Sequence, residues 1–261
     1  MTALPSSPPP ALPFTGRRIL VTGASSGLGA AVVRRFAAAG GAVYAASRDQ
    51  ERLATVAASC ADLPGEVRFG PLDVASPASC RDAVAAAVDA FGGLDVCVNN
   101  AGRHDFRRTT EVTEEQWAHD LAVNLNGVFF TSQAAIPHLL ASPGGNIVNV
   151  SSVAGIHGEA YSAAYTAAKH GVVGLTKALA VEYLTTGLRV NCVCPGGMDT
   201  PQVHTIEVPE GADWDLIMRI SAKRGFMTAD QVAATVCFLA SDDAAAVHGS
   251  IQLVDHGHLA G

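Results

Sequence analysis

Three residues near the middle of the chain have side chains and spacing suited to proton transfer at a carbonyl oxygen. Tyr165 and Lys169 lie four residues apart in an alanine-rich stretch with high helix propensity, so their side chains share one helix face. A phenol has a pKa of about 10, and a neighbouring ammonium lowers that pKa by favouring the phenolate. Ser152, at the end of an apolar strand-like run, offers a hydroxyl for the same substrate oxygen. To reduce a carbonyl group, these three residues would need only a hydride donor in addition.

Two neighbouring residues compete for these roles. Tyr161 is a second phenol, but no lysine stands four residues after it. Ser151 adjoins Ser152, and successive side chains of a strand point to opposite faces, so only one of the two serines faces the site. A tyrosine and a lysine at this spacing also occur on solvated surface helices. The Tyr–Lys pair alone is therefore weak evidence for an active site. Its spacing from other residues and the presence of further motifs carry more weight.

Ser152 precedes Tyr165 by thirteen residues, and Lys169 completes a Tyr-x-x-x-Lys motif. In this arrangement the stretch resembles the short-chain dehydrogenase/reductase family, and in particular its 3-oxoacyl-carrier-protein reductase-like members. A second motif agrees, because residues 22–29 (TGASSGLG) match the family's T-G-x-x-x-G-x-G cofactor motif. The resemblance covers roughly residues 16–257.

The glycine motif stands between a predicted strand, Arg17 to Val21, and a predicted helix that ends near Ala39. In that context Gly23 permits a tight turn, Gly27 lets the backbone approach a pyrophosphate, and Gly29 allows close helix packing. The helix N-terminus then presents free N–H groups and its positive dipole end to the phosphates. We expect the loop to bind the cofactor through Gly23, Ser25, Ser26, Gly27, Leu28 and Gly29.

The end of the second predicted strand, Ala42 to Ala46, distinguishes the two nicotinamide cofactors. A carboxylate there binds the ribose 2′-hydroxyl of NAD, whereas an arginine accommodates the 2′-phosphate of NADP. The resemblance places the acidic position on Ser47, which Arg48 follows, so NADP(H) is favoured. Ser47 and Gln50 also match a capping box, which would make Arg48 an ordinary solvated residue. Asp49 keeps NAD(H) possible.

The resemblance assigns further cofactor contacts to the ends of later strands. An aspartate at this place in the family binds the adenine, the NNAG turn lies beside the adenine ribose with Asn99 as the expected contact, and P-G-x-x-x-T holds the nicotinamide carboxamide. Purely structural alternatives are a helix cap, an asparagine-stabilised turn and a second cap, respectively. The residues concerned are Asp73, Val74, Asn99, Asn100, Ala101, Gly102, Pro195, Gly196 and Thr200.

Asn124 is a polar amide within an apolar helical pattern that runs from Thr113 to about Leu140. A buried amide needs hydrogen-bond partners. The resemblance implies that this asparagine anchors a water that relays protons to Lys169. Asn126, two residues later, competes for the role.

Composition limits the classes of function. Of the 261 residues, 49% are hydrophobic and 16% are charged, which is typical of a compact globular protein. The net charge of −7 and the lack of a basic block argue against a nucleic-acid partner. Six cysteines form no C-x-x-C pair, so we expect reduced core thiols, no metal site and a cytoplasmic location. No run approaches the ~20 apolar residues of a membrane helix, so we expect no membrane partner.

The chain is predicted to form a single α/β domain, residues 16–261, after a disordered proline-rich leader. Residues 1–15 hold five prolines and no charged side chain, and they lack the features of a signal peptide. Alternating strands and helices predict a doubly wound (Rossmann) fold with about seven parallel strands and helices on both faces. Residues 197–225 interrupt the alternation and are expected to form a substrate lid.

The resulting prediction is an NADP(H)-dependent oxidoreductase that interconverts a ketone and a secondary alcohol, with Asn124, Ser152, Tyr165 and Lys169 as its catalytic residues. The alternatives are an NAD-dependent alcohol or polyol dehydrogenase and a dinucleotide-sensing protein without turnover. By resemblance, the chain forms a homotetramer or a homodimer. Several side chains are candidate contacts for the small-molecule substrate, and the arginines among them suggest an anionic group such as an acyl carrier: Arg103, His104, Arg107, Arg108, His157 and Trp214.

Overall fold

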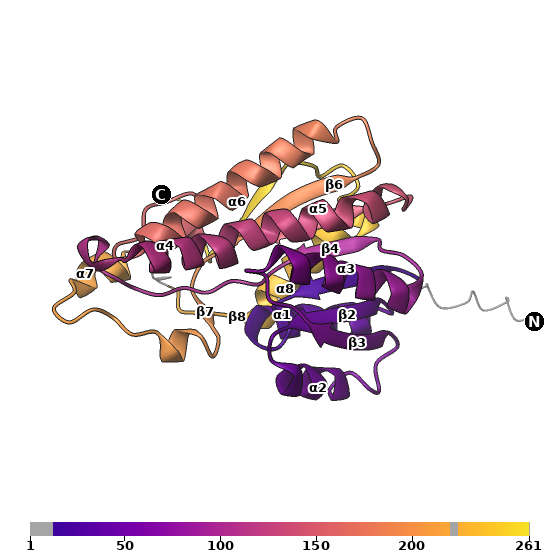
Figure 1. Cartoon of the computed structure of the whole chain (residues 1–261), viewed down its shortest axis with the longest axis horizontal. Helices are drawn as coiled ribbons and strands as arrows, with labels where there is room; N and C mark the ends of the chain where they lie inside the picture. Colours follow the sequence, from indigo (N-terminus) through magenta and orange to yellow (C-terminus); the bar gives the residue numbers. More distant parts are fainter. Residues whose placement is uncertain (1–12, 220–223, 261) are drawn as a thin grey trace, which may run out of the picture.

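A seven-stranded parallel sheet forms the centre of the molecule (Figure 1). The computed structural model describes residues 13–219 and 224–260. The strand order is β3-β2-β1-β4-β5-β6-β9, so the direction of winding reverses between β1 and β4. The strands are β1 (Arg18–Thr22), β2 (Ala42–Ser47), β3 (Glu66–Pro71), β4 (Val96–Asn99), β5 (Asn146–Val150), β6 (Arg189–Pro195) and β9 (Ile251–Val254). The predicted single α/β doubly wound domain is confirmed.

Helices cover both faces of the sheet. The helices are α1 (Gly27–Ala38), α2 (Gln50–Ala58), α3 (Pro77–Phe91), α4 (Glu114–Leu121), α5 (Gly127–Leu140), α6 (Ala163–Glu182), α7 (Trp214–Met218) and α8 (Ala229–Ala240). Ile19 and Val21 of β1 pack in the layer of α1, α2 and α8, while Leu20 packs in the layer of α3, α5 and α6. This alternation follows from the two-residue period of a strand.

The long helical pattern from Thr113 to Leu140 is present, but it is not regular throughout. Thr113 and Gln116 form the capping box that starts α4. A π-helical turn, Ala122–Asn126, then joins α4 to α5. Such turns insert an extra residue into the backbone ladder and often lie at functional sites. The periodicity of the sequence does not reveal this turn.

A small parallel sheet closes the base of the predicted lid. Its strands are β7 (Met198–Asp199) and β8 (Met227–Thr228), which pair directly. The 27 residues between Asp199 and Met227 form the loop that joins them. The described part of that loop carries a short 3₁₀ turn, Val203–Thr205, and α7, and it projects from one end of the molecule (Figure 1).

The predicted leader is too long by at least two residues. Phe14 is only 3% exposed and packs edge-on against Phe36 of α1, with ring centroids 4.7 Å apart. Its backbone N–H donates to the carbonyl of Ala39. Phe14 therefore belongs to the core rather than to a disordered leader. The prediction for residues 1–12 lies outside the described residues.

Candidate active site

The glycine loop after β1 approaches its neighbours too closely for side chains. Gly23 has φ +65°, and a Cβ there would lie 2.7 Å from Cα of Ala101. A Cβ on Gly29 would lie 2.2 Å from the carbonyl oxygen of Gly23. Ser26, the N-cap residue of α1, makes no side-chain cap hydrogen bond, and the first turn holds no acidic residue. An uncapped helix N-terminus of this kind suits an anionic group.

A hydrogen-bonded link joins the glycine loop to the end of β4. Thr22 Oγ1 accepts from the backbone N–H groups of Asn100 and Ala101, both at 3.0 Å. The Asn100 side chain donates to the carbonyls of Thr22 and Gly23 at 3.0 and 3.1 Å. The sequence carries no signal for this role of Thr22, because its partners lie almost eighty residues away along the chain. Together these bonds fix two loops at the carboxyl ends of adjacent strands.

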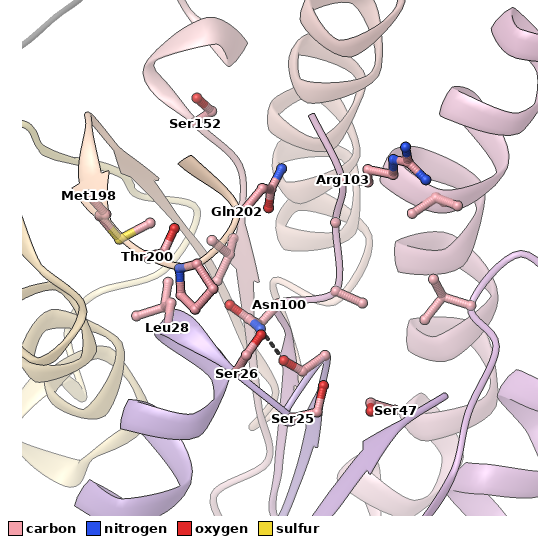
Figure 2. Close-up of a pocket in the computed structure, with 18 of the residues that line it drawn as sticks. Ser25, Ser26, Leu28, Ser47, Asn100, Arg103, Ser152, Met198, Thr200 and Gln202 are labelled. Carbon is pink, nitrogen blue, oxygen red and sulfur yellow. Dashed lines mark hydrogen bonds between the residues drawn. The ribbon is translucent and has the colours of Figure 1, made fainter. Parts of the chain in front are cut away.

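These loops border a cavity of about 430 Å³ at the carboxyl ends of the strands, where the winding reverses. Such a switch point is the usual ligand crevice of an open α/β sheet. In Figure 2, Ser152 lies toward one end of the cavity and Ser25 and Ser47 toward the other, with Asn100 and Ser26 between them. The predicted residues that line it are Gly23, Ser25, Ser26, Gly27, Leu28, Ser47, Arg48, Asp73, Val74, Asn100, Ala101, Gly102, Ser152, Tyr165, Lys169, Pro195, Gly196 and Thr200.

Three predicted residues do not line this cavity. Asn99 is 2% exposed, and its amide donates to Ser132 and Asn149 inside the protein, so the expected cofactor contact at Asn99 is wrong. Asn100, next in the chain, takes the place at the cavity wall. Gly29 supports the loop from behind, in keeping with its predicted packing role.

Asn124, the third, lies behind the site, with its amide bonded to the loop after β4 and to α4. Its Oδ1 accepts from the N–H of Arg103, and its Nδ2 donates to the carbonyls of Arg103 and Asp120. A Cβ on Gly102 would lie 3.0 Å from Asn124 Oδ1 and 3.3 Å from Lys169 Nζ, so these groups are close neighbours. Asn124 therefore holds the loop beside Lys169. The predicted proton relay through Asn124 stays a prediction.

An exposed arginine, Arg48, follows the end of β2 directly. Asp49, not Ser47, is the N-cap of α2: its Oδ1 accepts from the N–H of Arg52, and its Oδ2 lies 3.3 Å from Arg52 Nε. The alternative of a capping box between Ser47 and Gln50 is therefore wrong, although Gln50 does donate to the Ser47 carbonyl. Arg48 is exposed and makes no hydrogen bond or ion pair with any residue that the structure describes.

The cavity also has lining residues that the sequence analysis did not identify. They include Arg52, His119, Val123, Met198 and Gln202. Only Arg52 had a sequence signal, as a second basic residue four positions after Arg48. The other four come from elements whose approach to the cavity depends on the tertiary fold.

The catalytic candidates meet at the other end of the cavity. Lys169 of α6 is buried and donates to the carbonyl of Val150 at 3.0 Å, and its Nζ lies 5.6 Å from the ring centroid of Tyr165. Ser151 is only 3% exposed and its hydroxyl donates to the carbonyl of Lys169, whereas Ser152 lines both this cavity and a second one beside it. The chain thus anchors α6 to the end of β5 through two hydrogen bonds.

Burial changes the pKa values of Tyr165 and Lys169. It raises the pKa of Tyr165, with a smaller increase from the charge of Glu159 and a decrease from the hydrogen bond with Ser152. The expectation that Lys169 lowers the pKa of Tyr165 is therefore not met in the chain alone. Burial also lowers the pKa of Lys169 to about 8. At neutral pH the phenol therefore keeps its proton, which is the form that the reduction of a carbonyl requires.

The rival phenol has a structural role. The Tyr161 hydroxyl accepts from the backbone N–H of Asp213 in the lid, at 2.9 Å. Tyr161 also adopts φ +60°, which is uncommon for a residue with a side chain. It therefore ties the active-site loop to the lid and is absent from both cavity linings.

A second cavity, of about 320 Å³, adjoins Ser152 and Tyr165 beneath the lid. His104 and Trp214 line it, as expected for substrate contacts, whereas His157 does not. The described residues hold no cluster of metal-ligating side chains, and no described helix is long and apolar enough to cross a membrane.

The suggestion that clustered arginines bind an anionic carrier is not supported. Arg103 pairs with Asp105 at 2.8 Å, and Arg107 pairs with both Asp105 and Asp120 at 2.7 Å. Arg108 donates to a backbone carbonyl of the lid at 2.7 Å. Arg103 and Arg107 are thus neutralised by carboxylates of the chain, and Arg108 links the loop that follows β4 to the lid.

Comparison with known families decides the assignment, because residues 17–210 match the family model described as short chain dehydrogenase. The chain belongs to this family. It is 38% identical over 242 residues to a 3-oxoacyl-[acyl-carrier-protein] reductase of Thermotoga maritima, covering 93% of this chain and 97% of that protein. The predicted resemblance to this group of reductases is therefore confirmed.

Relatives with other names are equally similar. A 3beta-hydroxysteroid dehydrogenase of Mediterraneibacter gnavus is 38% identical over 263 residues, covering 94% of this chain and 95% of that protein. The solved structure of a short chain dehydrogenase from Burkholderia cenocepacia in complex with NADP has a TM-score of 0.85 and 33% identity, covering 95% of this chain and 99% of that one. The chain is thus a short-chain dehydrogenase/reductase, an oxidoreductase of the CH–OH/C=O class.

Proposed function

We propose that this short-chain dehydrogenase/reductase uses NADP(H) to interconvert a ketone and a secondary alcohol. The observation that carries the proposal is the convergence of Ser152, Tyr165 and Lys169 at one end of a cavity whose other end holds the glycine loop and Arg48. When bound, the nicotinamide supplies or accepts the hydride at the substrate carbon. The NADP complex of the Burkholderia cenocepacia relative supports the choice of cofactor class.

The chain's own residues manage the proton and the geometry. Tyr165 donates a proton to the carbonyl oxygen during reduction, and Ser152 holds the same oxygen by its hydroxyl. Lys169 holds the nicotinamide ribose and, when charged, stabilises the phenolate that Tyr165 leaves behind. Asn124 positions the loop beside Lys169 and supports the return of a proton to this pair.

The cofactor's adenosine end is assigned to the neighbourhood of β2. The 2′-phosphate binds Arg48, with Arg52 as a second cation in the same wall, because Arg48 is free of protein partners among the described residues. Asp49 is a weak candidate for a ribose hydroxyl, since both of its oxygens are engaged by Arg52. This engagement favours NADP(H) over NAD(H). Asp73 at the end of β3 and Asn100 complete the proposed adenosine subsite.

Substitution of Arg48 tests the cofactor preference. A charge-assisted hydrogen bond contributes about 1.5–3 kcal/mol, so Arg48→Ala should lower the ratio of kcat/KM for NADPH to that for NADH by roughly 10- to 150-fold. Adding Ser47→Asp should lower the ratio further by repelling the phosphate. Arg81→Ala, at an exposed arginine of α3 outside the cavity, is the control and should leave the ratio unchanged. An unchanged ratio in the Arg48→Ala variant contradicts the assignment.

A ketone panel tests the reaction itself. NADPH oxidation should be followed with an acetoacetyl thioester, cyclic ketones, a steroid ketone and a quinone-like diketone. Turnover of at least one of these compounds is expected. Tight NADPH binding without turnover of any ketone would instead favour a dinucleotide-sensing role.

The proposal also includes assembly into a homo-oligomer and a cytoplasmic location. The long helices leave apolar side chains exposed on the surface, including Phe129 of α5 and Val181 of α6, the latter 74% exposed. The exposure of these apolar side chains supports a homodimer or homotetramer in which copies cover them. The six cysteines are free thiols, which supports a reducing, cytoplasmic environment.

A further inference from the structure

The cavity beneath the lid is lined mainly by apolar side chains, and the described residues give it one carboxyl group. Phe106, Val153, Trp214, Ile217 and Phe226 contribute much of the wall. Glu159, from the loop between β5 and α6, lies in the same wall next to Tyr165 and His104. Apolar pockets use a few such polar groups to orient their ligands.

Glu159 is buried without a strong partner. Its side chain is only 6% exposed and makes no hydrogen bond to any residue within the described ranges. Among the described residues it comes within salt-bridge distance only of His104, whose Nε2 lies 3.6 Å from Glu159 Oε2 and 2.7 Å from Ser162 Oγ. Burying a carboxyl without a hydrogen-bond donor is unfavourable, so such groups are usually paired or functional.

Two described cations near this wall, Arg107 and Lys169, are engaged elsewhere. Arg107 is held by two aspartates, Asp105 and Asp120, at 2.7 Å, and Lys169 donates to the Val150 carbonyl. Burial lowers the pKa of His104 to about 4, which leaves the imidazole neutral at neutral pH. Burial raises the pKa of Glu159 to about 7. The Glu159–His104 contact is therefore not an ion pair of the resting protein.

The position of Glu159 relates it to the reacting atoms. The His104 ring stacks on the Tyr165 ring with centroids 4.3 Å apart. Oε2 of Glu159 lies 3.6 Å from Nε2 of the same imidazole. The charge of Glu159 also acts on the pKa of Tyr165. A substrate whose carbonyl carbon faces Tyr165 therefore places atoms only a few bonds away beside Glu159.

We propose that the substrate is a largely apolar ketone or secondary alcohol carrying a second hydrogen-bond donor, a hydroxyl or an ammonium group, that binds Glu159 and His104. This inference rests on the proposed function and adds a substrate class to it. The donor lies a few bonds from the reacting carbon, as on the opposite side of one six-membered ring. Glu159 accepts the hydrogen bond from the donor, and the imidazole supplies a second polar contact.

Matched cyclohexanones test the inference. We would measure kcat/KM for the NADPH-dependent reduction of 4-hydroxycyclohexanone, 4-methylcyclohexanone and 4-aminocyclohexanone. The first two compounds differ only in a hydroxyl and a methyl group of similar size, and the third supplies the ammonium group. We expect the wild type to favour one of the two donors over the methyl compound by roughly 10- to 100-fold, because a site built around a donor rejects its analogue. The preferred donor distinguishes a hydroxyl from an ammonium substrate.

Two variants assign the preference to the carboxyl. Glu159→Leu should reduce the donor-to-methyl ratio at least 10-fold, and Glu159→Gln should reduce it less for the hydroxyl than for the ammonium compound. Glu207→Gln, at an exposed lid carboxylate outside both cavities, is the control and should keep the wild-type ratio. Because the ratio compares substrates on one variant, partial misfolding lowers both values and does not alter it.

The outcomes separate the two proposals. Equal or better turnover of the methyl compound by the wild type, or an unchanged ratio in Glu159→Leu, overturns this inference and leaves the ketone reductase assignment intact. Absence of NADPH oxidation with every ketone, including the acetoacetyl thioester, contradicts the proposed function and the inference with it.

Discussion

Replacing Thr22 by valine should destabilise the protein although the two side chains have nearly the same shape. Thr22 is 1% exposed, and its hydroxyl accepts two backbone hydrogen bonds, from Asn100 and Ala101, while donating a longer one to Val98. The methyl group of valine cannot accept, so both N–H groups lose their acceptor. An unsatisfied buried donor costs about 1–3 kcal/mol.

The total for Thr22→Val is therefore about 2–4 kcal/mol, since both amides are only partly buried. With a urea m-value near 3 kcal/mol/M, the unfolding midpoint should fall by about 1 M. NADPH affinity should also fall, because the same two bonds hold the glycine loop against the end of β4. Equilibrium urea unfolding followed by circular dichroism, with NADPH fluorescence titration, measures both effects.

Thr55→Val is the matched control. Thr55 is exposed on α2, and its hydroxyl donates only to the Glu51 carbonyl one turn earlier. Its replacement should change the free energy of unfolding by no more than about 0.5 kcal/mol. If Thr22→Val unfolds at the same urea concentration as Thr55→Val, the link between the two loops does not have the stabilising role argued for it.

Two further predictions concern cofactor binding. Gly29→Ala should weaken NADPH binding at least 10-fold, because its Cβ would lie 2.2 Å from the Gly23 carbonyl oxygen and displace the loop; unchanged affinity in fluorescence titration would contradict this. NADPH affinity should decrease as pH rises beyond about 8, where the lowered pKa of Lys169 removes the ammonium that the bound cofactor favours. A dissociation constant that stays flat between pH 7 and about 9.5 would refute the proposed role of Lys169 in holding the ribose.

The local motifs were predictable because their spacing alone carries the information. The thirteen-residue separation of Ser152 and Tyr165 and the glycine loop both lie at the ends of apolar strands, where chain order fixes their place in a parallel sheet. Thr113 could likewise be identified as the start of a helix, because a capping box is a local pattern.

Residue-level orientation was harder to predict where both faces of a strand are buried. All four residues of β4 are buried, so the sequence does not alternate, and Asn99 could not be distinguished from Asn100 as the residue at the cavity. Asp49 satisfies the cap signature as well as Ser47 does, and only the structure shows which of the two caps α2.

Contacts between distant segments had no sequence signal. Glu159 and His104 are 55 residues apart, and their proximity follows from the way the loops after β4 and β5 fold over the cavity. The raised pKa of Tyr165 was missed for a related reason: desolvation depends on how the surrounding fold buries the phenol, whereas the sequence shows only the neighbouring lysine.

The most direct test of the account is NADPH oxidation by the Tyr165→Phe variant with the best ketone of the panel. Loss of the proton donor should reduce kcat by about 10²- to 10⁴-fold while the dissociation constant for NADPH stays within a few-fold of wild type. Tyr161→Phe, which removes the rival phenol and only its hydrogen bond to the lid, should retain kcat within a few-fold. Wild-type turnover by Tyr165→Phe would contradict the proposed mechanism.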